Sequence, residues 1–271
     1  MKKMRWFIIV AILVLAAAFF IFMVKKQELP LKIKEGGITS ISGILNQAKE
    51  AEAGLDLTAA KTAYQKLLNE FSNSAEVSSW QKKIDDLNIK LLFSPVITAN
   101  SALYEIKPGD SVVKIAREFK TTPELIIRSN NLSSDKIFPG KKIKVWTAPF
   151  SILVDKSQNT LIVKVGEEIF KTYVVSTGVN NCTPVGNFKI INKLTNPTWY
   201  KAGAVVPAGS TENVLGSRWL GLDKPSYGIH GTTDPQSLGK QVTQGCVRLS
   251  NQDVEELYTY IPAGTEVTIV D

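Results

Sequence analysis

A histidine and a cysteine lie close together near the end of the chain, each beside a glycine. His230 is the only histidine among the 271 residues, and Cys246, one of two cysteines, follows 16 positions later. A thiol attacks carbonyl groups only as the thiolate, and a free cysteine with a pKa of about 8.5 is mostly protonated at neutral pH. An imidazole within hydrogen-bonding reach can accept this proton. The pair therefore indicates nucleophilic catalysis by a cysteine. The competing interpretation is an inert cysteine and a locally bonded histidine.

The neighbouring glycines fit the remaining parts of such a site. A third group must hold the imidazole by its other nitrogen, and Gly231 would offer an unhindered backbone carbonyl for this purpose. Gly245 would let the backbone N–H groups beside Cys246 converge on an oxyanion. The sequence contains no Cys/His cluster with the spacing of zinc ligands and no ATP-binding signature, so we expect no metal and no other cofactor.

The N-terminal segment is apolar enough to enter a membrane. Residues 6–24, WFIIVAILVLAAAFFIFMV, carry no charge and have basic residues on both sides. A helix of this length would rise about 28 Å, which spans a bilayer core. A cleaved signal peptide ending after the alanines at 16–18 is the alternative, but the apolar run continues beyond them. We therefore predict an uncleaved anchor in residues 1–26, followed by a linker at 27–40, with the remaining chain on the outer side of the membrane.

The net charge of +7 bears on the class of partner. In an exported protein such a charge indicates attraction to anionic wall polymers or lipid head groups rather than to nucleic acid. Because the lysines are dispersed and form no long run, simple solubility is the alternative.

Residues 41–92 have the apolar spacing of helices. Apolar side chains recur every three or four positions in three stretches, with turns at Gly54 and at the Ser-Asn-Ser of residues 72–74. The predicted buried face of the middle stretch comprises Leu57, Ala60, Tyr64, Leu67, Leu68 and Phe71. The segment resembles a tetratricopeptide-type helical hairpin. The alternative is a plain helical spacer, and either form could bind a protein partner. A linker follows at residues 93–102.

Residues 103–147 form a compact module with short predicted strands, YEI and KIKVW, at its ends. Asp110 or Ser111 is expected to cap a first helix, and Thr122 a second helix with Pro123 in its first turn. This βααβ order, with YEIKPGDSVVKIA, NNLSS and IFPGKKIKV, resembles the LysM module, which binds N-acetylglucosamine-containing glycans such as peptidoglycan. The resemblance implies glycan contacts from two loops, at Gly109, Asp110, Ser111, Leu132, Ser133 and Ile137.

Residues 149–271 are predicted to be mainly β. SILVDKSQNTLIVKV predicts two strands around a turn at 157–159, and EIFKTYVVSTG, GNFKIINKL and AGTEVTIVD predict further strands. Ser250 and Asp253 have the spacing of a capping box before VEELYTYI, which predicts one helix.

This last domain resembles the L,D-transpeptidases with the YkuD-type fold, through YGIHGT, QGCVRLSNQDVEELY, LGSRWLGLD and TPVGNFKI. The resemblance implies that Cys246 is the nucleophile, that His230 is the general base and that the Gly231 carbonyl orients the imidazole. It also implies an oxyanion hole made by backbone N–H groups at Gly245, Cys246 and Gln244.

The resemblance places three further side chains against the substrate: Tyr227, Thr243 and Arg248. Arg248 would either bind a substrate carboxylate or brace the loop. Many family members have Ser-His-Gly-Cys before the nucleophile, whereas this chain has Thr-Gln-Gly-Cys, a departure that bears on fine tuning and not on the chemistry. A disulfide between Cys182 and Cys246 would abolish the nucleophile, so Cys246 is predicted to be free, and Cys182 has no predicted role.

In this family the thiolate attacks the carbonyl of the third stem-peptide residue, usually diaminopimelate, and expels the terminal D-alanine. An amine of a neighbouring stem then attacks the thioester and gives a 3→3 cross-link. Water, a free D-amino acid or a protein lysine is the acceptor in some members. The alternatives are a cysteine carboxypeptidase or endopeptidase that cleaves the same stems, and a non-catalytic wall-binding protein.

The predicted fold is therefore multidomain, with an N-terminal transmembrane helix, a small tetratricopeptide-like helical segment, a βααβ LysM module and a mainly-β catalytic domain. The predicted location is the bacterial cell envelope, and the predicted partners are peptidoglycan strands, their stem peptides and the membrane.

Overall fold

The structure is a computed structural model that describes residues 40–201 and 203–271. The predicted anchor at residues 6–24 lies outside these residues. Within the described ranges, no helix is long and apolar enough to cross a bilayer. The longest of them has 16 residues, a rise of about 24 Å, and carries charged side chains. The predicted fold class is corrected accordingly: the described chain consists of a helical segment, a βααβ module and a mainly-β domain, without a membrane-spanning helix.

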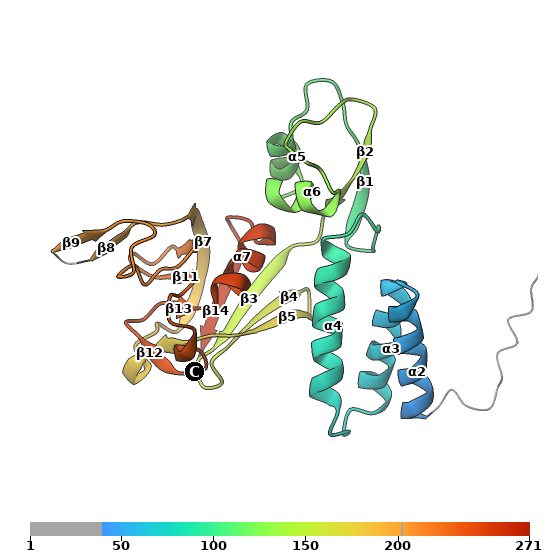
Figure 1. The fold of residues 1–271 in the computed structure, drawn as a ribbon, viewed down its shortest axis with the longest axis horizontal. Helices are drawn as coiled ribbons and strands as arrows, with labels where there is room; N and C mark the ends of the chain where they lie inside the picture. Colours follow the sequence, from blue (N-terminus) through green and yellow to red (C-terminus); the bar gives the residue numbers. More distant parts are fainter. Residues whose placement is uncertain (1–39, 202) are drawn as a thin grey trace, which may run out of the picture. The chain divides into compact units, whose positions relative to one another are not determined.

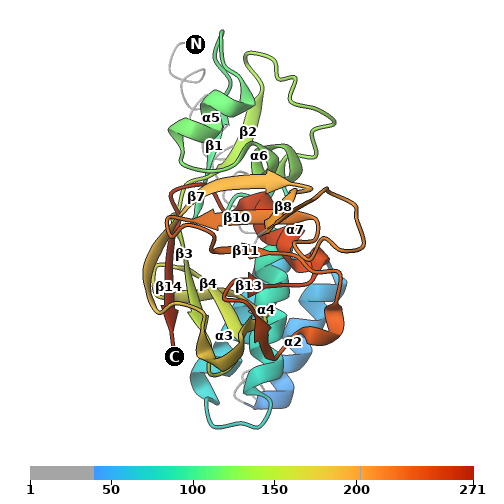
Figure 2. The same cartoon turned by 90° about the vertical axis from the view of Figure 1, so that its left-hand side faces the viewer.

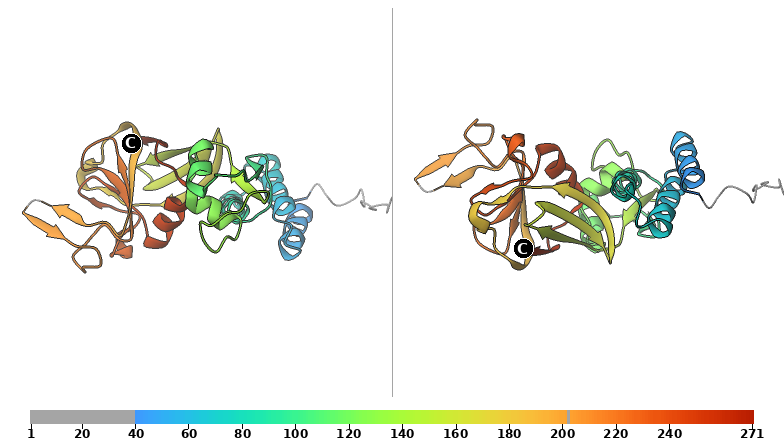
Figure 3. Two further views of the ribbon diagram at one scale, coloured as in Figure 1. Left: turned by 90° about the horizontal axis from the view of Figure 1, so that it is seen from above. Right: turned by 90° about the horizontal axis from the view of Figure 1, so that it is seen from below.

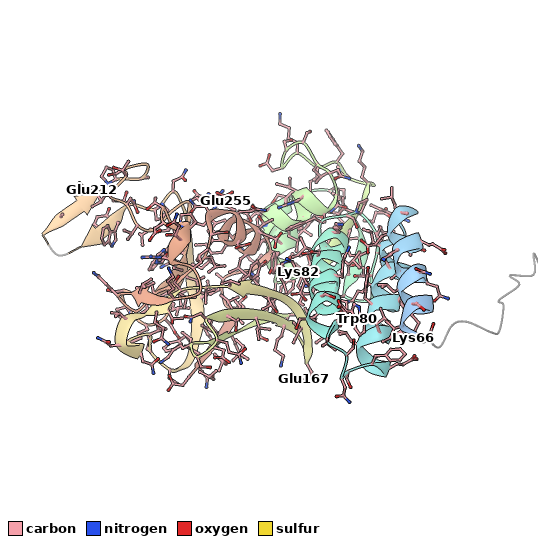
Figure 4. All side chains as sticks on the ribbon, turned by 60° about the horizontal axis from the view of Figure 1, so that its bottom comes forward. Lys66, Trp80, Lys82, Glu167, Glu212 and Glu255 are labelled. Carbon is pink, nitrogen blue, oxygen red and sulfur yellow. The ribbon has the colours of Figure 1, made fainter. Side chains whose placement is uncertain are left out.

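Three helices form the first part of the described chain: α2 (Ile41–Ala53), α3 (Leu57–Glu70) and α4 (Val77–Leu92), shown in Figure 1. Asp56 caps α3 by accepting a hydrogen bond from the Ala59 N–H, which satisfies a donor that the helix itself leaves unpaired. The predicted apolar face of α3 is confirmed, because each of its members is buried or packs against a common core. Trp80 of α4, labelled in Figure 4, joins this core.

Side chains of α4 cover the edge of the large sheet in the C-terminal domain. β5 (Glu168–Val174) is the last strand on one side of that sheet, so a row of its backbone groups lacks a neighbouring strand. Asn88 Nδ2 donates to the Phe170 carbonyl at 2.8 Å. Asp85 Oδ2 accepts from the Thr172 N–H at 2.8 Å, and burial raises the pKa of this carboxyl. Both side chains are buried, so α4 supplies hydrogen bonds that another strand would otherwise make.

The βααβ module has the predicted order of elements. β1 (Ser101–Glu105) pairs antiparallel with β2 (Lys142–Trp146), and α5 (Val112–Glu118) and α6 (Pro123–Ser129) stand between them in the sequence. The Ser111 side chain accepts from the backbone N–H of the third residue of α5, and the Thr122 side chain accepts from that of the third residue of α6. Both predicted caps are therefore confirmed, with Ser111 rather than Asp110 at the first.

Lys144 of β2 binds the end of α4. Its side chain is 2% exposed, and Nζ donates to the carbonyl oxygens of Leu91 at 2.6 Å, Ser94 at 2.9 Å and Leu92 at 3.4 Å. The last carbonyls of a helix have no partner within the helix, and a cation is favoured beside them. Burial lowers the pKa of Lys144 to about 8. The βααβ module thus caps the C-terminus of α4.

An eight-stranded sheet is the framework of the C-terminal domain, with the strand order β13-β11-β10-β7-β14-β3-β4-β5 (Figures 1 and 2). Its members besides β5 are β3 (Phe150–Asp155), β4 (Thr160–Val165), β7 (Gly186–Thr195), β10 (Arg218–Leu222), β11 (Gly228–His230), β13 (Val247–Arg248) and β14 (Glu266–Val270). Neighbouring strands are antiparallel except for β14 with β3 and β11 with β13, which are parallel.

Two smaller pairs flank the sheet: β6 (Thr177–Gly178) with β12 (Gln241–Thr243), and the β8 (Trp199–Lys201) and β9 (Ala204–Val206) hairpin, best seen in Figure 3. The hairpin between β3 and β4 turns where the sequence predicted, with Asn159 at φ 50. The predicted helix is α7 (Asn251–Tyr260). Its predicted N-cap is confirmed, since Ser250 Oγ accepts from the Asp253 N–H at 3.0 Å. The Asp253 carboxylate accepts from the Ser250 hydroxyl at 2.7 Å, whereas in a capping box it would accept from the Ser250 backbone N–H.

The main core is shared by all three parts of the chain. Trp146 of β2 stacks on Phe150 of β3 with ring centroids 5.1 Å apart, and Phe150 contacts Tyr260 of α7 at the same distance. Leu92 of α4 and Leu125 of α6 complete the cluster. The helical segment and the βααβ module are therefore packed into the domain that carries the predicted site.

We expect Lys144→Met to lower the free energy of unfolding by about 1–3 kcal/mol, because the carbonyl groups of Leu92 and Ser94 would lose the Lys144 donor. The Leu91 carbonyl would keep its bonds from Ser94. Urea denaturation measures the change. Lys142→Met, at an exposed position on the same strand, is the control, and equal stability of the two variants would show that the Lys144 bonds contribute nothing.

Candidate active site

The parallel pairing of β11 with β13 brings the predicted nucleophile and base to one face of the sheet. Ile229 is in register with Val247, and His230 with Arg248. Cys246 immediately precedes β13. Because side chains alternate between faces along a strand, His230, Cys246 and Arg248 share one face, while Ile229 and Val247 lie in the core on the other.

His230 is held in one tautomer. Its side chain is 3% exposed, and Nδ1 lies 2.6 Å from the Gly231 carbonyl oxygen. A carbonyl only accepts hydrogen bonds, so Nδ1 carries the proton and Nε2 keeps its lone pair, which is the form that a general base needs. Burial lowers the pKa of His230 to about 4, and the charge of Arg248 acts in the same direction, although the backbone carbonyls of Gly231 and Leu215 act in the opposite one. The imidazole is therefore neutral at neutral pH.

Trp219 stacks on His230, a contact that the sequence analysis missed. The two residues are in register on β10 and β11, and their rings lie 5.9 Å apart between centroids with an angle of 19°. A Cβ at Gly228 would come within 2.6 Å of the indole. A glycine inside a strand often marks a close approach of this kind, so Gly228 was the available signal.

Burial disfavours the thiolate form of Cys246. Its side chain is half-buried, and Sγ donates to the Ser226 carbonyl at 3.6 Å. Burial raises the pKa of the thiol, and the Gly228 N–H and the Arg248 charge offset this only in part. Because burial also keeps the imidazole neutral, a thiolate–imidazolium pair is disfavoured before the substrate binds.

Thr243 fixes the loop that carries Cys246. Its buried hydroxyl donates to the Cys246 carbonyl at 2.7 Å and accepts from the Gly245 N–H at 3.2 Å. The structure thus places Thr243 beneath the loop, and it engages one of the N–H groups expected in the oxyanion hole. Tyr227 covers the same loop. A Cβ at Gly245 would lie 2.7 Å from its ring, and φ there is +122, so this position requires glycine. Gln244 is exposed.

Asn251 joins two segments around the site. Its Oδ1 accepts from the Ser217 N–H at 3.0 Å and from the Thr232 N–H at 3.1 Å. A Cβ at either Gly216 or Gly231 would lie 2.2 Å from this oxygen, so no other residue fits at these positions. The sequence shows Asn251 only as the first residue of a capped helix, because its partners are distant along the chain.

Arg248 both braces the site and keeps a donor unpaired. Nη1 donates to Ser237 Oγ at 3.1 Å, whereas Nε is buried and has no partner among the described residues. The side chain lines a pocket of about 350 Å³ together with Asp234, Ser237 and Lys240. Both roles that the sequence left open are thus compatible with its position.

Cys182 lies beside the loop that carries Cys246. It is exposed, its Sγ is 3.9 Å from the Thr243 carbonyl oxygen, and neither cysteine forms a disulfide in the structure. Its proximity to Cys246 arises from the turn after β6 and has no local signal in the sequence.

The expected glycan contacts occupy two loops of the βααβ module, at Gly109, Asp110, Ser111, Leu132, Ser133 and Ile137. Asp110 Oδ2 accepts from the Lys107 N–H at 2.8 Å and from the Tyr104 hydroxyl at 2.9 Å, so this carboxylate fixes the first loop. Phe138 of the second loop is not among the residues that the sequence analysis named as glycan contacts. Its side chain is 61% exposed, and an aromatic ring in the IFPG turn was the signal.

Comparisons with known proteins cover most of the described chain. A family model for the L,D-transpeptidase catalytic domain matches residues 149–269, and a LysM domain model matches residues 104–146. YkuD of Bacillus licheniformis, named as an L,D-transpeptidase, is 34% identical over 175 residues, which cover 62% of this chain and 98% of that protein. YkuD of Bacillus subtilis is 34% identical over 173 residues, covering 61% of this chain and 97% of that protein. YqjB of Bacillus subtilis, also named as an L,D-transpeptidase, is 39% identical over 126 residues, covering 44% and 70%.

We expect the ring protons of His230 to titrate near pH 4 in an NMR experiment, and their signals need no assignment because the chain has one histidine. The folded pKa lies below the unfolded one, so unfolding takes up a proton between these values. Stability is therefore complete above about pH 6.5 and is lost as the pH falls towards 4. A midpoint near 6.5 in the folded protein would contradict the buried neutral imidazole.

Asn251→Ala should lower the free energy of unfolding by about 1–3 kcal/mol, because two backbone N–H groups lose their acceptor. The His230 ring signals should shift at the same time, since the segments on both sides of the base lose a shared contact. Gln252→Ala, at the next and exposed position, is the control. Unchanged His230 signals in Asn251→Ala would show that Asn251 does not position the base.

Proposed function

Because the chain belongs to the L,D-transpeptidase family, we propose that Cys246 is the nucleophile of this protein and His230 its general base. The family consists of acyltransferases that cross-link peptidoglycan. The LysM and catalytic domains of this chain together associate it with the cell wall or envelope. The observation that carries the assignment is the bond of His230 Nδ1 to the Gly231 carbonyl, which leaves Nε2 to accept a proton on the face shared with Cys246.

Acylation begins when Nε2 takes the thiol proton as the sulfur attacks the carbonyl of the third stem residue. The buried, neutral imidazole is already in the accepting form, so no proton must first be removed from it. The developing imidazolium is stabilised by the Gly231 carbonyl, which accepts from Nδ1. The same imidazolium then protonates the leaving amine of D-alanine, and the acyl group remains on Cys246 as a thioester.

The oxyanion is proposed to bind the backbone N–H groups of Cys246 and Gln244. The N–H of Gly245 already donates to Thr243 Oγ1, so it joins the oxyanion hole only if that bond opens. Preorganised N–H groups are effective because they need no reorientation as the charge develops.

Transfer follows when an acceptor amine attacks the thioester and His230 takes its proton. An amine from a second stem gives the 3→3 cross-link, and water would give hydrolysis by the same half-reaction. Arg248 is proposed to bind a carboxylate of the stem through its unpaired Nε while Nη1 stays on Ser237. A buried guanidinium donor without a partner fits a negatively charged group.

The LysM module is proposed to hold a glycan strand through its two loops. Phe138 offers an exposed ring on which a sugar can stack, in the loop that also holds Leu132, Ser133 and Ile137. The helical segment is proposed to act within the chain, because α4 hydrogen-bonds to β5 and its end is capped by Lys144. This packing gives the segment a role that requires no protein partner.

Incubation with a disaccharide-tetrapeptide should add an acyl group to the protein and release D-alanine, both detectable by mass spectrometry. Cys246→Ala should form no adduct. His230→Gln should slow acylation by about 10²–10⁴-fold, since the sulfur remains but its base is lost. Cys182→Ala is the matched control and should acylate like the unmodified protein.

An acyl adduct that still forms in Cys246→Ala would contradict the assignment of Cys246 as the nucleophile. The later products identify the acceptor. A dimeric muropeptide establishes cross-linking, whereas a tripeptide alone indicates hydrolysis of the thioester by water.

A further inference from the structure

A cleft of about 740 Å³ lies between the LysM module and the catalytic domain. Lys193 of β7 lines it and is in register with Leu220, which is in register with Ile229. Lys193 therefore projects from the face of the sheet opposite to the one that carries His230 and Cys246. The volume is within the range of small-molecule binding sites, which often lie at domain junctions.

A buried hydroxyl without a partner lines this cleft. Thr121 is 7% exposed, and its Oγ1 is one of three buried side-chain atoms in the described ranges that make no hydrogen bond. An unpaired buried polar group lowers stability, so such atoms are rare and call for a reason. A ligand hydroxyl or amide in the cleft would supply the missing bond.

Lys193 also lines the cleft and has unused hydrogen-bond donors. Its Nζ donates to the Tyr258 carbonyl at 2.6 Å and lies 4.1 Å from the centre of the Tyr258 ring, which leaves two of its three protons unused. Burial lowers its pKa to about 8. Lys193 forms no salt bridge with any of the described residues. The Glu124 carboxylate raises the pKa of Lys193 against this burial but makes no ion pair with it, so Nζ can still bind an anionic group in the cleft.

The remaining lining combines positive charge with apolar surface. Arg117 and Lys120 add two exposed cations against the single carboxylate of Glu124, while Phe119 and Tyr258 contribute rings. A sugar ring presents an apolar face and hydroxyl groups at its edge, so it matches rings next to hydroxyl donors. The excess of cations selects a sugar that carries a carboxylate.

We propose that this cleft binds a carboxylate-bearing N-acetylated amino sugar of a peptidoglycan strand from which the stem peptides have been removed, because an attached stem converts the sugar's carboxyl group into an uncharged amide. The site is separate from the LysM loops and from the catalytic centre. The carboxylate would lie on Lys193, and a hydroxyl or amide of the sugar on Thr121 Oγ1. The proposal rests on the proposed function in that the polymer is peptidoglycan. The cleft and Cys246 lie on opposite faces of the sheet. A glycan strand held in the cleft would therefore attach the enzyme to the wall without blocking the reaction at Cys246.

Calorimetry on the full chain tests this with two probes: a peptide-free disaccharide of N-acetylated hexosamines with a carboxylate on one ring, and its uncharged counterpart. The carboxylated probe should bind about tenfold more tightly, as expected for one charge-assisted hydrogen bond. Lys193→Met should remove this preference. Lys189→Met, an exposed lysine on the same strand outside the cleft, should keep it.

Thr121→Val removes the hydroxyl and keeps the shape of the side chain, so it creates no cavity. It should weaken binding of the carboxylated probe several-fold and leave the unfolding midpoint unchanged or higher, because the replaced hydroxyl is unpaired in the free protein. Phe138→Ala separates the LysM loops: it should weaken binding of the uncharged probe and leave the preference for the carboxylate intact.

Equal binding of the two probes by the unmodified protein would overturn the proposal, as would identical behaviour of Lys193→Met and Lys189→Met. Binding of a sugar-free stem peptide that depends on Lys193 would assign the cleft to a peptide and overturn it too. Acylation of Cys246 is measured separately. If no adduct forms but the carboxylate preference holds, the catalytic assignment fails and the cleft site stands.

Discussion

The register of two short parallel strands determines whether this chain has an active site. His230 and Cys246 share a face only because Ile229 of β11 pairs with Val247 of β13, and a slip of one residue would turn the thiol to the other side of the sheet. Contacts on both sides maintain the register. Leu249 N–H donates to the His230 carbonyl at 2.8 Å, and the other edge of β13 bonds to Ser176 in both directions. The N-cap of α7 follows directly after β13, so Cys246 lies between two segments that are fixed by hydrogen bonds.

The other end of the same sheet depends on a different device. The backbone of β5 has no strand beyond it, and two side chains of α4 take over hydrogen bonds there. That helix is in turn fixed at its end by Lys144 of the LysM module. A buried amide, a buried carboxylate and a buried ammonium thus connect the helical segment with the LysM and catalytic domains, which two separate family models match. Each is a polar group in a low-dielectric interior, where an intact network is rigid and a broken one is unfavourable.

Features with a local signal were predictable from the sequence, and features created by distant pairing were not. The helix caps at Thr122 and Ser250 follow from side chains that bond to backbone a few residues ahead, and the histidine–cysteine pair follows from chemistry and motif. Asp85, by contrast, appears in the sequence as an ordinary charged residue on a helix, and only the fold places it on a strand edge. The contacts of Asn251 and Trp219 likewise depend on strands far apart in the chain. The predicted anchor lies in residues that the structure does not describe.

The α4–β5 junction limits how this protein can be divided. A recombinant fragment that starts at residue 149, where the catalytic family match begins, would lack Trp146 and every side chain of α4. Its aromatic core would be open beside Phe150, and β5 would present free N–H and C=O groups at its edge. Such an edge recruits a strand from a second molecule, so the isolated fragment would tend to self-associate. In the full chain, the helical segment and the LysM module cover this core and this strand edge, and so would prevent such self-association.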